Sequence, residues 1–505
     1  MIMIIRNQLR ILIPFSFCIL AFFCQGCATL KLSHFIAAAP QRPEEYRQFY
    51  ARIDASVIKN GTADASTFQV KGFPYLRANR FLLGLRKKAI TEPQKQLWLE
   101  WMRQMDVASR IKEINNLPDS VINELTSGIT GTSGRNTLIE KTKTISETLL
   151  REDQKKAGFY EAVGYGLRDT DGYSTIMRAI GLYPVFSLPV AFVTSTSYSA
   201  IHSTHASSID NLKTYGELTA FAPETIGSFN AESMPEIFLR QKKNLFNVPE
   251  LTNEEIDKLA LALAPVIYQD VAADYDRFGK ISWKKNHVSI EEQNPIVYYY
   301  PSYAFIKGAP VLQINYTLWY NARAGKHAPW IERGPLDGLT IRVTLDTQGN
   351  PIMMDIMNNC GCYHFFVPRK EKISKITSHP IAIDPLVPDW LPEDFPEKRV
   401  NLFVNTGWHQ VDHIFTKKVP AKTASYTLVP YDILESLPHE DGHKESVFNR
   451  YGIMKNSSRI EPYIFFFSGI YKIGYMRQRG NHAVKIVGRE NFTDPEIFDK
   501  NFSFK

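Results

Sequence analysis

Residues 339–356, LTIRVTLDTQGNPIMMDI, decide the fold of the second half of the chain. Apolar residues alternate with polar ones from Leu339 to Leu345 and again from Ile352 to Ile356, and Asp346–Asn350 lies between the two runs. A period of two is typical of a strand with one apolar face, and Asp, Gly and Asn are the residues of tight turns. The stretch therefore predicts a β-hairpin.

Further short segments around this hairpin are rich in β-branched and aromatic residues. They are 297–303, 310–320, 399–404 and 483–487, and Gly, Pro and Asp separate them from one another. Such segments with turn residues between them indicate antiparallel strands. Residues 280–505 are therefore predicted to form a β-rich, largely antiparallel region that also carries the candidate site.

The preceding part of the chain has helical periodicity. Apolar residues recur at helical spacing in 43–60, 93–115 and 137–162, and Thr252 and Glu255 form a capping box at the start of a helix predicted to reach Phe278. The Ser/Thr-rich stretch 194–208 is expected to form turns. Residues 43–279 are thus predicted to be a mainly helical region, and the whole chain an α+β fold.

The composition limits the class of protein. Hydrophobic residues make up 44% and charged residues 22% of the 505 residues, so a folded globular body is expected. The net charge of +7 is spread over short clusters such as Arg86–Lys88 and Lys417–Lys418. Scattered charges of this kind indicate solvated faces, or faces near anionic lipid headgroups, and not a nucleic-acid-binding stripe.

The first 27 residues predict export. Arg6 and Arg10 precede an apolar run from Ile11 to Phe23, which suits a signal core and is too short to span a membrane. The segment resembles the bacterial lipoprotein signal, because Gly26 precedes Cys27, although Cys24 stands where Leu, Val or Ile is usual. This resemblance implies a signal peptide over residues 1–26, an anchor linker over 27–42, and lipid, palmitate included, on Cys27. The implied location is the cell envelope, at the outer membrane facing the periplasm.

Cys360, Cys362 and His364 form a Cys-x-Cys-x-His cluster directly after the predicted hairpin. In an extended segment, alternation places the three side chains on one side of the chain. Three interpretations stay open: a disulfide between Cys360 and Cys362 in an oxidising compartment, ligation of zinc or copper(I), and free thiols with a redox role.

A second cluster contains His409, Asp412 and His413. On a helix or a strand the two histidines share a face, and Asp412 can orient a ligand or act as a base. If the fold adds His364, three imidazoles leave an open coordination position at which water becomes nucleophilic near neutral pH. The alternative is a set of buried structural histidines.

Residues 439–443, HEDGH, spell the metalloprotease motif of two histidines around Glu-x-x. The motif requires a helix so that both rings reach one zinc ion. Gly442 weakens a helix and Asp441 occupies a position that is uncharged in the metalloprotease family this motif resembles. An exposed acidic turn is the alternative interpretation.

A basic cluster near the end of the chain contains Arg477, Arg479 and Arg489, with His482 between them. Guanidinium groups clamp carboxylates and phosphates with two hydrogen bonds, and His482 is a candidate fourth metal ligand. The alternative is a solvated basic loop.

Several stretches resemble a family of large, uncharacterised lipoproteins of Gram-negative bacteria. They are GFPYLR at 72–77, GPLDGL at 334–339, CGCYH at 360–364, and the segment from Met476 to Arg489. The resemblance spans most of the chain after the signal and implies the compartment only. It assigns no activity and no residue roles.

Two functions are compatible with these features. The first is a metal-dependent hydrolase, with zinc as the expected metal, and its proposed residues are the ligands His364, His409, His413 and His482, with Asp412, Arg477 and Arg479 acting on the substrate. The second is a non-catalytic envelope lipoprotein that binds a protein, a glycan or a lipid.

Overall fold

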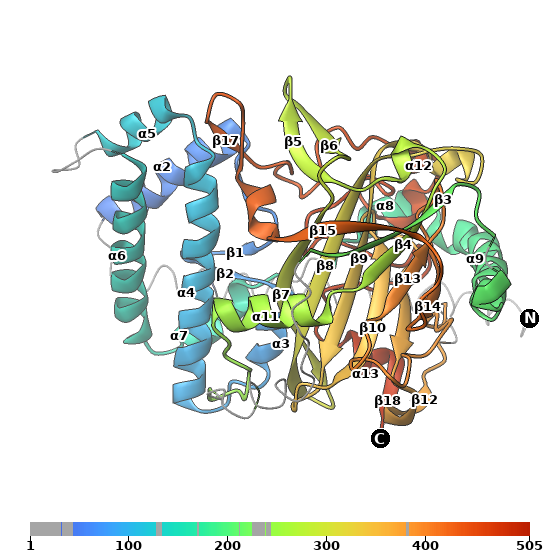
Figure 1. Ribbon diagram of the computed structural model, residues 1–505. Coiled ribbons are helices and arrows are strands. Elements are labelled where there is room, and N and C mark those ends of the chain that lie inside the picture. Colours follow the sequence, from blue (N-terminus) through green and yellow to red (C-terminus); the bar gives the residue numbers. More distant parts are fainter. Residues whose placement is uncertain are drawn as a thin grey trace, which may run out of the picture. The chain divides into compact units, whose positions relative to one another are not determined.

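A computed structural model describes residues 32, 44–127, 134–168, 171–211, 213–224, 238, 244–379 and 383–505 (Figure 1). The chain divides into two compact units. Unit 1 comprises Met1–Ser56, Thr67–Ile111 and Asp119–Asp169, and unit 2 comprises Val57–Ser66, Lys112–Pro118 and Thr170–Lys505. The predicted lipid-attachment residue, Cys27, lies outside the described residues.

Unit 1 is mainly helical, as predicted. The helices α2 and α4 confirm the predictions for 43–60 and 93–115. The described elements of this part of the chain are α2 (Glu44–Asn60), β1 (Phe68–Val70), β2 (Phe73–Ala78), α3 (Arg80–Arg86), α4 (Glu92–Asn115), α5 (Asp119–Thr126), α6 (Arg135–Gln154) and α7 (Phe159–Gly166).

The helix predicted for 137–162 is two helices. The first, α6, ends at Gln154, and α7 begins at Phe159. Gly158 between them has a φ of 77°, in the left-handed region that a helix of L-residues does not continue through. The single continuous helix was therefore a wrong prediction.

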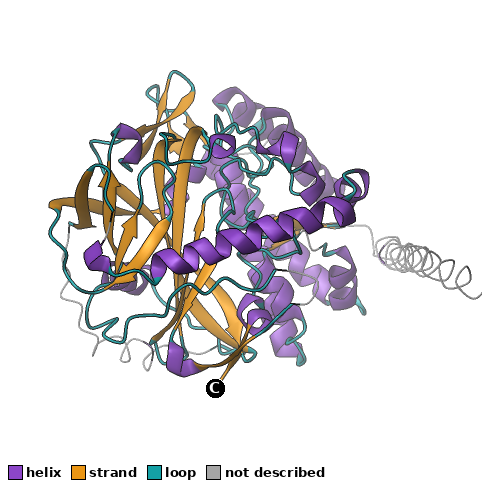
Figure 2. Cartoon of the chain, turned by 90° about the vertical axis from the view of Figure 1, so that its right-hand side faces the viewer, coloured by secondary structure: helices purple, strands orange, loops and turns teal. Residues whose placement is uncertain are grey.

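Unit 2 is built on a mixed ten-stranded sheet that curls into a half-barrel (Figures 1 and 2). Six of the neighbouring pairs are antiparallel and three are parallel, which confirms the α+β fold with a β-rich, largely antiparallel C-terminal region. In sheet order the strands are β11 (Phe365–Pro368), β10 (Pro351–Asn358), β9 (Gly334–Leu345), β8 (Ala309–Arg323), β7 (Ile296–Ile306), β15 (Lys422–Pro430), β3 (Glu217–Pro223), β4 (Val266–Val271), β13 (Asn401–Val404) and β14 (Val411–Phe415).

Smaller elements surround this sheet. Two-stranded pairs are formed by β5 (Lys280–Lys284) with β6 (His287–Glu291), β12 (Ile373–Ile376) with β18 (Phe502–Phe504), and β16 (Leu437–Pro438) with β17 (Lys444–Glu445). The α-helices are α8 (Thr175–Ile180), α9 (Tyr183–His205), α11 (Asn253–Leu263), α12 (Glu461–Ile464) and α13 (Ile497–Asn501). Among the described residues, we find no helix with the length and apolar character needed to cross a membrane.

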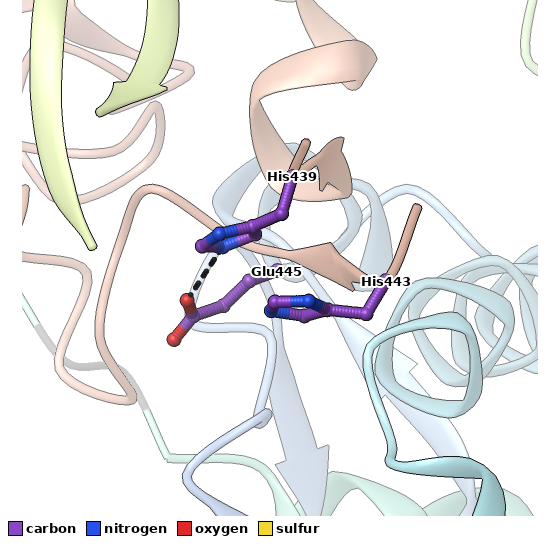
Figure 3. Close-up of side chains that lie close together, drawn as sticks. All are labelled: His439, His443 and Glu445. Carbon is purple, nitrogen blue, oxygen red and sulfur yellow. Dashed lines mark hydrogen bonds and ion pairs between the residues drawn. The ribbon is translucent and has the colours of Figure 1, made fainter. Parts of the chain in front are cut away.

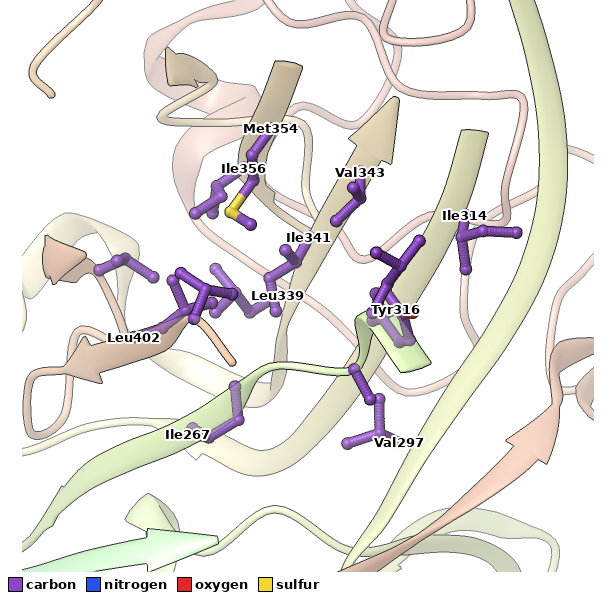
Figure 4. Close-up of a cluster of buried hydrophobic side chains, with 14 of the residues drawn as sticks. Ile267, Val297, Ile314, Tyr316, Leu339, Ile341, Val343, Met354, Ile356 and Leu402 are labelled. Atoms are coloured by element: carbon purple, nitrogen blue, oxygen red, sulfur yellow. The ribbon is translucent and has the colours of Figure 1, made fainter. Parts of the chain in front are cut away.

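The predicted hairpin is confirmed as β9 and β10. Val343 faces Met354 and Ile341 faces Ile356 across the pair. These side chains join the largest apolar core, together with residues of β4 and β13 such as Ile267 and Leu402 (Figure 4). Burial of this apolar face is the main force that fixes the register, because a shift of one residue would turn it outward.

The polar face of the same hairpin is buried as well. Arg342 and Asp355 lie opposite each other on it and are almost inaccessible to solvent. The rings of Phe492 and Phe498, from near the end of the chain, lie over the Arg342 guanidinium at 3.6 and 5.5 Å. The sheet is therefore covered on both faces at this point.

Three other sequence predictions were wrong. The helix that begins at the Thr252 capping box ends at Leu263 instead of Phe278, because Pro265 cannot continue it and β4 follows. The predicted turns at 194–208 are largely the second half of α9, in which hydroxyls such as that of Ser197 donate to carbonyls one turn earlier. The strand predicted at 483–487 is reduced to a single bridge between Ala483 and Asn491.

Candidate functional site

The HEDGH sequence forms a tight turn between β16 and β17. The backbone N–H of Gly442 donates to the carbonyl of His439 (3.0 Å), and the N–H of His439 donates to the carbonyl of His443 (2.8 Å). Gly442 has a φ of 86°, which is typical of the left-handed position that closes a short hairpin loop. The exposed turn is thus the interpretation that the structure confirms, and the helix required by the metalloprotease motif is not formed.

The turn brings three potential metal ligands together (Figure 3). One nitrogen or oxygen atom each of His439, His443 and Glu445 lies within 4.8 Å of the others. The two imidazole rings stack with their centroids 3.9 Å apart, and His439 Nε2 lies 3.0 Å from Glu445 Oε2. Among the residues that the structure describes, no other group of three or more His, Cys, Asp or Glu side chains meets this criterion.

Neighbouring side chains hold this group in place. The indole of Trp283, on β5, stacks on the His439 ring at 4.5 Å and an angle of 13°. The ammonium of Lys455 pairs with Glu445 Oε1 and lies 5.2 Å from the Trp283 ring. As a result the His439 side chain is only 7% exposed, whereas that of His443 is 52% exposed and contacts Asp441. The side chain of His439 is therefore fixed, and that of His443 is accessible to solvent.

The electrostatics of the turn favour an ionised carboxylate. Burial alone raises the pKa of Glu445, but Lys455 and His439 outweigh it and hold that pKa below its usual range. Two imidazoles and one carboxylate are a ligand set typical of zinc, and three protein ligands leave a fourth position open. The group could therefore hold a metal ion.

His409 lies elsewhere, between two carboxylates in the interior. Its Nδ1 is 2.8 Å from Asp337 Oδ2 and its Nε2 is 3.3 Å from Asp276 Oδ1, and all three residues are fully buried. The ring also stacks on Tyr320 with centroids 3.8 Å apart. Asp337 additionally binds the buried Arg323 through both of its oxygens. Both ring nitrogens of His409 thus face carboxylates of the protein itself.

These carboxylates set the charge of His409. Burial alone lowers its pKa, but Asp276 and Asp337 outweigh that effect and raise it above the usual value. Burial also raises the pKa of Asp337, but Arg323 and His409 outweigh this effect, so the pKa of Asp337 lies below its usual range. The cluster favours a charged imidazolium between two carboxylates, whereas a metal ligand is a neutral imidazole.

The residues around His409 carry backbone strain. His409, Tyr363 and Leu336 have φ values of 56°, 55° and 57°. Glu332 joins two of these segments, since it accepts hydrogen bonds from Trp408 Nε1 (3.1 Å) and from the Tyr363 hydroxyl. Left-handed non-glycine residues persist where the surrounding contacts fix them, and here a buried polar network does so.

His364 and His413 have partners of their own. His364 Nε2 lies 2.8 Å from Asp355 Oδ2, next to the Arg342 pair. His413, on β14, is near Ser207 Oγ (3.4 Å) and the ring of His205 (6.1 Å). Burial and His205 lower the pKa of His413 to about 4. The structure does not bring His364, His409 and His413 together at one point.

The other predicted site residues also contact groups of the protein itself. Burial raises the pKa of Asp412 to about 6, even though Asn405 donates to both of its oxygens. Arg477 donates to the backbone carbonyls of Cys360, Tyr471 and Lys472, while Arg479 pairs with Glu435 and Asp432. His482 is buried with its ring 6.3 Å from that of Phe492.

Cys360 and Cys362 are free thiols in the structure. The N–H of Cys362 donates to Cys360 Sγ at 3.3 Å, and the two sulfurs sit side by side in a turn around Gly361. The hydrogen bond with Cys360, followed by burial, raises the pKa of Cys362. The disulfide between them stays a prediction for an oxidising compartment.

The metalloprotease motif contains His439 and His443, but the sequence pattern did not indicate the third candidate ligand. The motif contains Glu440, which is exposed, whereas the carboxylate that reaches the rings is Glu445, two residues after the motif. In a hairpin the facing side chains come from both strands, so the spacing of a helical motif misses this residue. Trp283 and Lys455 lie outside the motif, so no local sequence pattern indicated that they would contact it.

Comparisons with known proteins identify no relative of this chain. No protein-family model, no curated protein and no solved structure matches this chain. The resemblance to Gram-negative lipoproteins therefore stays a prediction.

Proposed function

We propose that this protein is a lipid-anchored protein of the cell envelope that binds a divalent transition-metal ion, with zinc preferred, at the turn between β16 and β17. The observation that carries the proposal is the convergence of His439, His443 and Glu445 within 4.8 Å. The lipid anchor rests on the sequence around Cys27 alone. Loss of palmitate labelling in a Cys27→Ser variant is its test.

The ligand types favour zinc over calcium or magnesium. Imidazole nitrogen suits zinc, copper and nickel, whereas calcium and magnesium take oxygen ligands. Only Glu445 supplies oxygen to this group. Copper(II) and nickel are the expected competitors, because they bind such sites at least as tightly as zinc does.

Lys455 and Trp283 prepare the site for the ion. Lys455 engages Glu445 Oε1, which leaves Oε2 directed at His439 and at the proposed ion. Trp283 restricts rotation of the His439 ring by stacking. Partners of this kind orient ligands, and their loss costs about 10- to 100-fold in metal affinity.

Zinc titration of the purified protein tests the proposal. We expect one zinc ion per chain, and a loss of roughly 100-fold or more in affinity when His439 or His443 is replaced by Ala. His287→Ala is the matched control, because His287 is an exposed histidine on the neighbouring β6. Equal zinc binding by His439→Ala, His443→Ala and the control would contradict the proposal.

A metal-dependent hydrolase is the second candidate. Two histidines and one glutamate are also the protein ligands of catalytic zinc sites, in which the open position holds water. The accessible ring of His443 leaves that position open to solvent. Zinc-dependent hydrolysis of an ester or peptide substrate that disappears in His443→Ala, and not in His287→Ala, would favour this candidate over binding alone.

A further inference from the structure

The segment from α8 to the middle of α9 exposes an unusual number of large apolar side chains. Phe192 is 72% exposed, and the others range from about half to three quarters exposed. The residues are Ile176, Ile180, Leu182, Val185, Phe186, Leu188, Phe192 and Val193. Monomeric soluble proteins expose such residues singly, and a contiguous set of them marks an interaction surface.

The second half of α9 fixes this segment to unit 2. Tyr198 and Ile201 pack against the main apolar core, and the ring of His205 contacts the carbonyl of Val411 at 3.0 Å. The first half, Tyr183–Val193, also contacts unit 2, because the Tyr183 hydroxyl accepts a hydrogen bond from the Gly488 N–H (2.7 Å), but most of its large apolar side chains stay exposed. The sequence of α9 contains no Asp, Glu, Lys or Arg.

A second segment extends the same surface. Ile460, Tyr463, Ile464, Phe466 and Tyr471 are exposed around α12 and the short 3-10 helix at Phe466–Ser468. This 3-10 helix contacts both α8 and α9, and the rings of Phe186 and Phe467 lie 5.8 Å apart. We call the exposed residues of 176–193 and 460–471 the apolar surface.

The two segments lack acidic side chains over long stretches. No Asp or Glu occurs in 172–209 or in 462–489. Among the basic residues of the same stretches, Lys472 lies beside the exposed Tyr471 ring at 5.8 Å, whereas Arg477, Arg479, Lys485 and Arg489 bind carbonyls or carboxylates of the chain itself. Arg178 lies over the rings of Tyr173 and Tyr183 at 4.6 and 4.1 Å. An apolar surface that lacks acidic side chains over these stretches and has Lys472, Arg178 and tyrosine rings beside it is complementary to anionic lipid headgroups above an acyl layer.

We propose that the apolar surface inserts into the interface of a phospholipid bilayer that contains anionic lipid. The apolar side chains enter the acyl boundary, while Tyr463 and Tyr471 lie at headgroup depth, as amphipathic rings do. Lys472 adds electrostatic attraction. This contact goes beyond the proposed metal function, does not involve the turn at 439–443, and does not need lipid on Cys27.

Vesicle flotation tests the proposal with a chain that begins at residue 28 and so carries no lipid. The probe is a vesicle of phosphatidylethanolamine and phosphatidylglycerol, and vesicles of phosphatidylcholine alone are the comparison. We expect the protein to float with the anionic vesicles and to bind them about tenfold less at high salt. We expect the double variant Leu188→Glu and Phe192→Glu to lose binding by about tenfold or more.

The control variant is Ile90→Glu. Ile90 is 77% exposed and belongs to unit 1, so Ile90→Glu makes one substitution of the same kind, with half the added charge of the double variant, at an equally accessible apolar position. It should bind vesicles as the unchanged protein does. Circular dichroism should be the same for all variants, because the replaced side chains are exposed. Lys472→Glu, which changes charge alone, should weaken binding to anionic vesicles only.

Two results would overturn the proposal. One is that the unchanged protein fails to float with anionic vesicles, or that the double variant floats equally well. The other is that light scattering shows a dimer which the double variant disrupts, with no vesicle binding, because a second copy of the chain would then cover the apolar surface.

Discussion

Arg342 and Asp355 face each other across β9 and β10 and form a two-bonded ion pair inside the protein. Arg342 Nε and one terminal nitrogen lie 2.8 and 2.5 Å from the two oxygens of Asp355, and both side chains are at most 1% exposed. His364 binds the same carboxylate, and the remaining terminal nitrogen of Arg342 donates to the carbonyl of Phe492. Every nitrogen and oxygen atom of the two charged groups therefore has at least one hydrogen-bond partner in the protein.

The first prediction concerns this pair. Asp355→Asn leaves the Arg342 charge buried without a counter-ion, so the free energy of unfolding should fall by about 3–5 kcal/mol. Urea denaturation measures it. Glu217→Gln is the control, because Glu217 and Lys422 form an ion pair of similar length (2.9 Å) that is more than half exposed, and its loss should cost less than about 1 kcal/mol.

A double variant separates the charge from the packing. Arg342→Met with Asp355→Leu removes both charges, and it should be less destabilising than the sum of the two single changes. If Asp355→Asn costs no more than Glu217→Gln, the buried pair contributes little and the prediction is wrong.

The second prediction concerns how the contribution of His409 to the free energy of unfolding depends on pH. Its pKa in the folded protein lies above the usual value because Asp276 and Asp337 outweigh burial. A raised histidine pKa means that the folded state holds a proton that the unfolded state has released. The stability from His409 is thus complete below about pH 6.5, the ordinary histidine pKa, and is lost as pH rises through the folded-state pKa.

Urea denaturation from about pH 6 to about pH 9 measures this effect. The unfolding free energy of the unchanged protein should exceed that of His409→Gln most at the acid end, and the difference should shrink with increasing pH. His287→Gln, at an exposed histidine, is the matched control for the substitution. A difference that grows with pH would refute the assignment of an imidazolium.

The third prediction concerns Glu461, on α12. Burial, and secondarily the Glu332 carboxylate, raise its pKa to about 7, although Arg323 and Arg459 oppose the shift. The unfolded state therefore ionises first, and stability from this group falls as pH rises from its ordinary value near 4.5 to about 7. Glu461→Gln removes this loss of stability, because a glutamine side chain does not ionise.

Thermal unfolding at several pH values checks this prediction. Relative to the unchanged protein, Glu461→Gln should gain stability between about pH 4.5 and about pH 7 and keep that gain above it. Glu254→Gln, at an exposed glutamate on α11, is the comparison: the hydrogen bond from Lys258 holds the pKa of Glu254 below its usual value, so this variant should gain no relative stability over the same range. A Glu461→Gln variant that loses relative stability over this range would show that the carboxylate is stabilised in its ionised form.

The hairpin at 339–356 could be predicted because its signal is local. Alternation, turn residues and length all lie within eighteen consecutive residues. The burial of Arg342 could not be predicted, because the side chains that cover it, Phe492 and Phe498, come from about 150 residues further along the chain. Polar residues in a strand are normally taken as its solvent face, and here they are interior.

For the candidate site too, local features could be predicted and long-range contacts could not. Two of its three ligands stand in a recognisable motif, and the turn was one of the two expected forms of that motif. Glu445 and Trp283 depend on how strands pair, which the sequence pattern does not specify. The other histidines were each identified as candidates, but whether they converge depends on long-range packing, and His364, His409 and His413 each contact a polar side chain of their own.

The late position of Phe492 and Phe498 has a consequence for synthesis. A nascent chain that has completed β9 and β10 holds Arg342 and Asp355 on an uncovered face until residues 490–504 emerge. The sheet also needs β15 to pair with β3, across about 200 residues. We therefore expect unit 2 to complete its folding only after residues 490–504 have been synthesised, and chains interrupted before residue 490 to be proteolysed rather than to accumulate as partly folded units.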